Sequence, residues 1–95
     1  MLNNIVKNVT LTGNSVVTVT EEDVSRNVTI KGFECKINSE NPAKPIEFSN
    51  FFISEEAKGL YMEHKDEVRK DIADFEDTAF ELQKKMIAEK QAGAE

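Results

Sequence analysis

The sequence has no tryptophan and only one cysteine, one histidine and two prolines, and it contains no long apolar run. A single cysteine, Cys35, excludes an intramolecular disulfide. An apolar run such as Phe51–Ile53 falls far short of the roughly 18 residues that a membrane helix needs, and residues 1–10 lack the apolar stretch of a signal peptide. The sequence therefore predicts a cytoplasmic protein.

The sequence also lacks an excess of positive charge. It contains 12 basic and 18 acidic residues, which give a net charge of −6. This balance opposes nonspecific binding to nucleic acids and to anionic membranes. At 95 residues, of which 39% are hydrophobic, the chain is long and apolar enough for one small folded domain. We expect a single domain over 1–95, with a β-rich part at 1–53, a helical part at 54–92 and a frayed tail at 93–95.

Turn and strand signals divide the β-rich part into four segments. The stretch 13–15, Gly-Asn-Ser, is typical of a hairpin loop, and a three-residue loop there would pair Val9 with Val19 on the buried face. In the third segment the apolar positions change phase at Gly32, which predicts a β-bulge, and residues 45–53 form the fourth. The pattern predicts an α+β fold, with a four-stranded antiparallel sheet followed by one long C-terminal helix.

The helix is predicted at about 55–91. Ser54 is a suitable N-cap, and the two glutamates after it place negative charge at the positive end of the helix dipole. Apolar residues then recur at spacings of three and four, which is typical of a helix with one packed face. The residues expected to pack there, on the sheet or in a dimer, are Val68, Ile72, Phe75, Ala79, Phe80, Leu82, Met86 and Ile87.

The expected helix is longer than the expected strands. About 37 helical residues would span roughly 55 Å, whereas strands of six to ten residues reach roughly 20–33 Å. Two arrangements would accommodate the extra length of the helix. Either the helix breaks in the polar stretch 63–71 and folds back, or its far half packs against a second copy. We favour the second, a homodimer, because an apolar far end is costly to leave in water.

The residues that carry catalytic chemistry are few. Cys35 and His64 are the only candidates for a cysteine–histidine pair, and with Glu63 or Asp66 they could complete a zinc site, but the paired ligands of structural zinc sites are missing. The sequence also has no glycine-rich phosphate loop and no Gly-x-Ser-x-Gly motif. We therefore predict no enzyme activity, no metal site and no cofactor, with packing as the ordinary role of both residues.

Carboxylates on the helix are the most suggestive feature. On a helix they form a line of negative charge at intervals of about 5 Å, which is of the order of the phosphate spacing in nucleic acids. Such a line could occupy a basic groove built for DNA or RNA. The alternative is an ordinary solvated face, whose acidity four nearby basic residues partly offset. The predicted partner-binding residues are Glu63, Glu67, Asp71, Asp74, Asp77 and Glu81.

Two phenylalanines in the strands allow another interpretation. Phe33 and Phe48 could stack on bases, while Arg26, Lys31, Lys36 and Lys44 contact phosphates. Four strands followed by a helix also resemble the order of elements in the single-stranded-DNA-binding transcriptional coactivator family. The acidic helix departs from what such a binder needs, so core packing of both rings is the favoured interpretation.

A second resemblance covers the helical half. The segment LYMEHKDEVRKDIADFEDTAFELQKKM, residues 60–86, resembles the helical tails of small accessory proteins in bacteriophages of low-GC Gram-positive hosts. The resemblance implies a protein that acts by binding, either to a host defence machine or within the virion, and it brings no catalytic residue. Three hypotheses follow: an anti-CRISPR-like inhibitor acting on a basic surface, a phage tail or virion assembly protein, and a single-stranded nucleic-acid-binding dimer.

Overall fold

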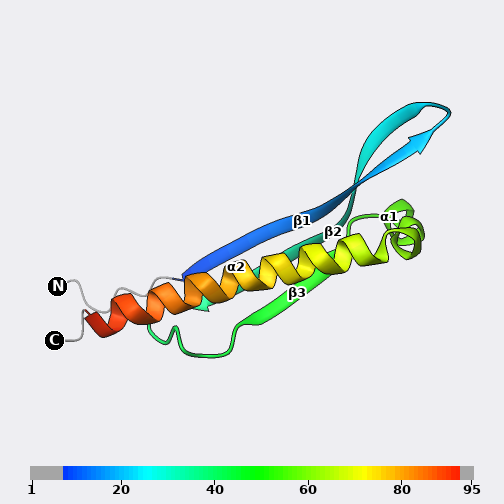
Figure 1. Cartoon of the computed structure of the whole chain (residues 1–95). Helices are drawn as coiled ribbons and strands as arrows, with labels where there is room; N and C mark the ends of the chain where they lie inside the picture. The colour runs from blue at the N-terminus through cyan, green and yellow to red at the C-terminus, as the bar shows by residue number, and fades with distance from the viewer. Residues whose placement is uncertain (1–7, 93–95) are drawn as a thin grey trace, which may run out of the picture.

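The computed structural model describes residues 8–92 and has an α+β architecture, a three-stranded antiparallel sheet followed by helices (Figure 1). The elements in chain order are β1 (Asn8–Glu21), β2 (Val24–Asn38), β3 (Glu47–Phe52), α1 (Glu55–Leu60), a 3₁₀ turn (Tyr61–Glu63) and α2 (Lys65–Ala92). The strands lie side by side in the order β1-β2-β3. The α+β class is thereby confirmed, while the frayed tail expected at 93–95 lies outside the described residues.

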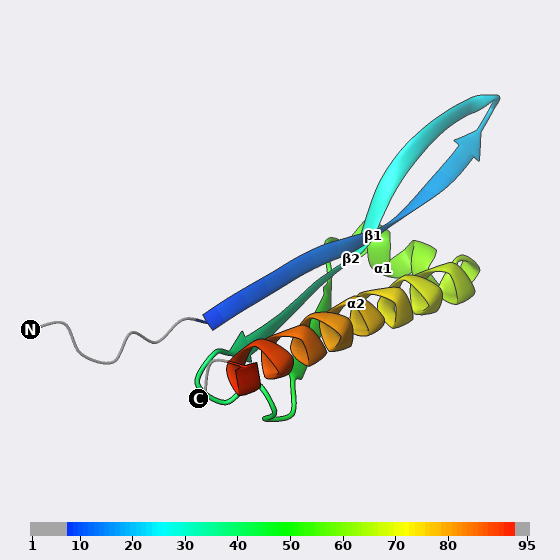
Figure 2. The same ribbon diagram turned by 60° about the vertical axis from the view of Figure 1, so that its left-hand side comes forward.

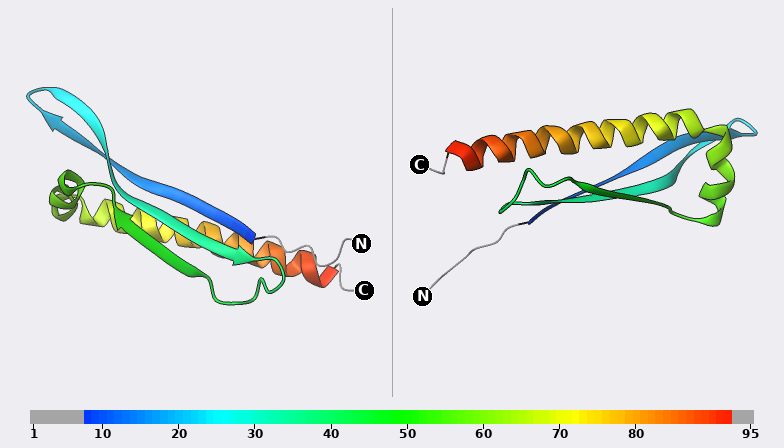
Figure 3. Two further views of the ribbon diagram at one scale, coloured as in Figure 1. Left: turned by 180° about the vertical axis from the view of Figure 1, so that it is seen from behind. Right: turned by 90° about the horizontal axis from the view of Figure 1, so that it is seen from below.

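The molecule has two layers. Helix α2 runs along one face of the sheet, and α1 crosses between the layers at one end (Figure 3, right). No described element covers the opposite face, which we call the open face (Figure 3, left). The β1–β2 hairpin is longer than the layer of helices, so its twisted tip projects past α1 (Figure 2).

The predicted fourth strand does not exist within the described chain, because residues 13–15 do not turn. They continue as the middle of β1, where Gly13 pairs with Phe33 and Asn14 with Gly32. A Cβ atom on Gly13 would lie 3.3 Å from the ring of Phe75, so this glycine permits the close approach of α2. The Gly-Asn-Ser composition was a misleading turn signal. These small residues lie in an extended strand because α2 packs closely against it.

The hairpin turns instead at Glu22 and Asp23. Both residues have positive φ angles, 49° and 64°, and the strands close at the pair Glu21 and Val24. Two central residues with positive φ are typical of a type I′ turn, which normally uses Asn-Gly. The sequence signal was absent because this hairpin makes the turn with two acidic residues.

An Asn-Gly turn at these positions is expected to stabilise the protein. The double substitution Glu22→Asn, Asp23→Gly should raise the free energy of unfolding by about 1 kcal/mol, because asparagine and glycine adopt the left-handed conformation at lower cost. Urea denaturation measures the change. Glu47→Asn, on the open face, is the control, and an equal or lower stability of the double variant would contradict the interpretation of the turn.

A β-bulge is present in β2, as predicted, but at Ile30 and not at Gly32. Ser15 pairs with Lys31 and Val16 with Thr29, which leaves Ile30 as the extra residue of β2. The bulge turns the apolar residues on both sides of it towards α2, as the change of phase required. The buried residues of β2 are Val28, Ile30, Gly32, Phe33, Cys35 and Ile37.

The predicted helix is broken at the start of the 63–71 stretch. His64 has non-helical angles, φ −119° and ψ 18°, and separates the 3₁₀ turn from α2. Ser54 is the N-cap of α1, as predicted, and its hydroxyl accepts from the backbone N–H of Ala57 at 3.1 Å. The prediction that the helix is longer than the strands was wrong. The strands β1 and β2 have 14 and 15 residues, so they are about as long as α2.

The core lies between the sheet and the packed face of the helices. One cluster joins Val17, Val28, Ile30, Ala57 and Val68, with Ile72 packed against it. A second cluster is aromatic: the ring of Phe75 lies 5.4 Å from that of Phe33 and 6.3 Å from that of Phe48, whose ring in turn lies 5.5 Å from Phe80. Val68, Ile72 and Phe75 therefore pack on the sheet of their own chain, whereas Phe80 is 48% exposed at the margin.

Candidate protein-interaction surface

The acidic residues predicted to bind a partner fall into two groups. Five of them have exposed side chains, in the 3₁₀ turn and along α2, and we call these five the carboxylate row: Glu63, Glu67, Asp74, Asp77 and Glu81. Near the start of α2, Nδ1 of His64 lies 3.3 Å from Oε1 of Glu67. Arg69, Lys70, Lys84 and Lys85 are exposed on the same helix.

Asp71 differs from the carboxylate row. Its side chain is half-buried, and Oδ2 accepts a hydrogen bond of 2.6 Å from the hydroxyl of Ser15, which is fully buried in β1. This bond links α2 to the edge strand of the sheet. Sequence spacing could not reveal it, because Asp71 stands three residues after Val68 and three before Asp74, and so belongs equally to the packed face and to the acidic line.

Two of the basic residues suggested for phosphate contacts are engaged within the chain. Nζ of Lys31 lies 4.6 Å from the ring centre of Phe52 and 5.2 Å from that of Tyr61, and it donates to the side chain of Asn50. Arg26 pairs with Glu56 at 3.0 Å. The hydrogen bond and the charge of Arg26 hold the pKa of Glu56 below its usual value, although so exposed a pair contributes little to stability.

The phenylalanines considered as stacking platforms are part of the core. Phe33 is 4% exposed and Phe48 is half-buried, and both rings pack against Phe75. The core-packing interpretation is confirmed, since both rings pack on the helix side of the sheet.

Cys35 and His64 do not meet. Cys35 is buried in β2 between its strand partners Leu11 and Phe48, and burial raises the pKa of its thiol. Phe48 contacts α2 at Phe75, three helical turns beyond His64. Within residues 8–92, no three histidine, cysteine or acidic side chains are grouped so that they could hold a metal ion.

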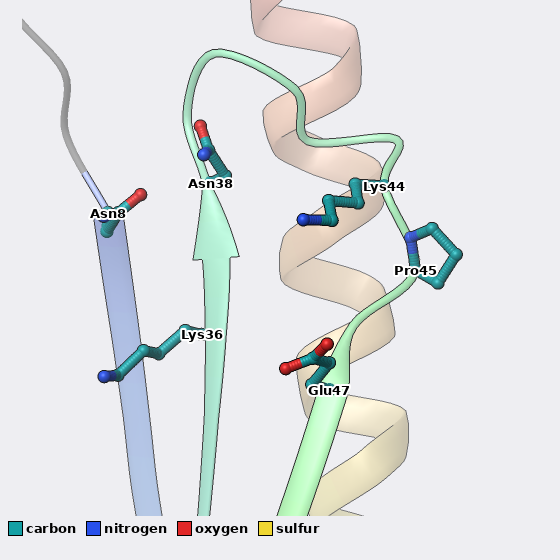
Figure 4. A pocket seen from close by; sticks show the side chains of 6 residues that line it. All are labelled: Asn8, Lys36, Asn38, Lys44, Pro45 and Glu47. Carbon is teal, nitrogen blue, oxygen red and sulfur yellow. The ribbon is translucent and has the colours of Figure 1, made fainter.

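A small polar hollow of about 200 Å³ lies where β1, β2 and the loop before β3 come together (Figure 4). Figure 4 shows the ammonium group of Lys44 turned towards Asn38, while Lys36 extends across β1. The lining combines two lysines with one carboxylate, and Lys36 lies opposite Glu47 in the strand pair. Its residues are Asn8, Lys36, Asn38, Lys44, Pro45 and Glu47.

The open face carries an apolar patch that the sequence analysis did not identify. Val16, Phe51 and Ile53 are 44%, 52% and 49% exposed there. A Cβ atom on Gly32 would come within 2.7 Å of the ring of Phe51, so the ring lies directly over the glycine. The sequence signal for this patch was the run Phe51–Ile53, which places apolar side chains on both faces of the strand.

Comparisons with protein-family models, curated proteins and solved structures found no match for this chain. Neither helix of the described chain combines the length and the apolar character needed to cross a membrane.

Proposed function

We propose that this protein is a non-enzymatic, phage-encoded inhibitor that binds a host nucleic-acid-handling defence protein, in the manner of anti-CRISPR proteins. The observation that carries the proposal is the carboxylate row, which presents four exposed acidic side chains on a helix of 28 residues and a fifth, Glu63, in the 3₁₀ turn before it. The partner is a protein with a basic nucleic-acid-binding surface, and the site of action is the bacterial cytoplasm.

The packing of α2 makes the row suitable for this task. The aromatic cluster and the bond between Ser15 and Asp71 hold the helix on the sheet, so its backbone has little conformational entropy to lose when a partner binds. Exposed charges on both proteins accelerate association and favour the correct partner more than they raise affinity. The complex is therefore expected to weaken as the salt concentration rises.

The test is solution mass by light scattering, for the protein alone and mixed with a CRISPR effector carrying its guide. The expected result is a complex that salt weakens and target DNA displaces. The triple variant Glu67→Lys, Asp74→Lys, Glu81→Lys should lose at least tenfold in affinity for the effector, because all three carboxylates are exposed and leave the core unchanged.

The matched control is Glu22→Lys, Glu40→Lys, Glu47→Lys. These side chains are also exposed, and three reversals bring the net charge from −6 to zero in both variants. Retained binding by the control together with lost binding by the helix variant supports the proposal. Equal affinities of the two variants would contradict it, because net charge alone would then explain the interaction.

A second candidate function is assembly within a phage tail or virion, and the apolar patch on the open face favours it. Large exposed apolar groups that lie together often mark protein interfaces. Such a protein would form large assemblies without the effector, and these would tolerate the helix reversals but not Phe51→Asp.

A further inference from the structure

The first observation concerns the edge of the sheet formed by β1. Residues 8–20 contain no charged residue, although 32% of the chain is charged. Exposed edge strands are normally short or protected by charges, prolines or bulges, because their free backbone groups pair with other strands. The opposite edge follows this rule: β3 has six residues, begins with Glu47 and follows Pro42 and Pro45.

A groove beside the β1 edge is the second observation. It has a volume of about 590 Å³ and lies at the start of β1. Val9, Leu82 and Met86 supply the apolar part of its lining, and Ser39, Glu40, Glu89 and Lys90 supply the polar part. Val9, Leu11 and Val19 are only half-buried, although they point to the side of the sheet that α2 covers. A further strand on this edge would place every second side chain towards these residues and remove their apolar surface from water.

We propose that this strand is β1 of a second copy, paired antiparallel about a two-fold axis, so that two chains form one six-stranded sheet. The sequence of residues 8–20 favours a second copy as the occupant, because it is self-complementary in opposite directions about Asn14, with Val9 facing Val19 and Leu11 facing Val17. Two chains of net charge −6 repel each other, and the negative charge is concentrated on the hairpin tip and on α2. The uncharged edge is where two copies approach with the least repulsion.

The uncharged segment also fixes the register. It runs from residue 8 to residue 20 and is centred on Asn14, so pairing it with itself places Asn14 at the axis. Val9 then lies opposite the partner's Val19. Directly opposed residues in a sheet point to the same face, so both copies of α2 cover the same face of the joined sheet. The carboxylate row lies on the outer side of α2, so this dimer does not depend on the proposed function.

The first test is the solution mass of the protein and of Thr12→Lys, Val16→Lys by sedimentation equilibrium at micromolar concentration. Both positions are exposed on the open face, so the substitutions cost the monomer little. In the proposed register the new lysine at position 12 lies opposite the new lysine at position 16 of the partner. Every dimer therefore contains two pairs of opposed lysines, which repel each other. We expect a dimer for the unmodified chain and a monomer for the variant.

The control is Ala43→Lys, Ser49→Lys, which adds the same charge at exposed positions near the β3 edge. It should remain a dimer. An unmodified chain that is monomeric, or a control that dissociates as readily as the Thr12 and Val16 variant, would overturn the proposal.

Cross-linking tests the register. In Asn14→Cys, a short bismaleimide should join two chains, because opposed residues in an antiparallel pair lie roughly 5 Å apart. In Ser49→Cys, the two thiols would be separated by five strand intervals, roughly 24 Å, and the same reagent should not join them. Cys35 is buried and does not compete. Equal cross-linking of the two variants would overturn the β1 interface.

Discussion

Replacing Phe75 with alanine is expected to lower the free energy of unfolding by about 3–4 kcal/mol. The ring of Phe75 packs on Phe33 and on Phe48, and it lies over the backbone of β1 at Gly13. Removing it leaves a cavity at the point where α2 meets all three strands. Since a small domain is usually stable by 5–15 kcal/mol, the variant should fold but denature at much lower urea concentration.

Phe80→Ala is the matched control, with the same change on the same helix. Phe80 is 48% exposed and contacts the ring of Phe48, so its loss should cost about 1 kcal/mol. Both variants are measured by urea denaturation followed by circular dichroism. If Phe75→Ala costs no more than Phe80→Ala, Phe75 is not the centre of the aromatic cluster.

The second large effect is expected at Ser15 and Asp71. Ser15→Ala should lower the free energy of unfolding by about 2 kcal/mol, because it removes the 2.6 Å hydrogen bond and leaves a half-buried carboxylate without its donor. Asp71→Ala should have a similar cost. By contrast, Asp74→Ala, one turn away and exposed, should change stability by no more than about 0.5 kcal/mol.

A double-mutant cycle separates this bond from other effects of the substitutions. If the bond stabilises the fold, the double variant Ser15→Ala, Asp71→Ala should be about 1.5–2 kcal/mol more stable than the sum of the single losses predicts. Additive losses would show that the two side chains act independently, contrary to the structure.

The outcome at Asp71 also bears on the proposed function. A lysine at this position would disturb both the core and any binding surface, so a loss of binding could reflect unfolding. The helix variant therefore uses three residues of the carboxylate row and leaves Asp71 unchanged. Partner binding and stability are thus measured on separate residues.

Features that depend on near neighbours in the chain were predictable from the sequence. The N-cap at Ser54 was one, since a hydroxyl there reaches an amide three residues later. The change of phase in β2 was another, because alternation of faces is a fixed property of a strand, although the bulge lies at Ile30 and not at the predicted Gly32. The packed face of α2 followed from its spacing of three and four residues, which is set by the geometry of the helix.

Other features depended on residues far apart in the chain. Gly13 could belong to a turn or to a strand, and contact with Phe75 decided for the strand. Asp71 could belong to the acidic surface or to the packed face, and Ser15, 56 residues earlier, decided for the packed side. The sequence by itself determined the fold class, the helix cap and the periodic faces, because local geometry sets them. The number of strands, and which carboxylates are exposed and which one is packed, were decided only in the tertiary structure, because there the packing of α2 on the sheet outweighs local preferences.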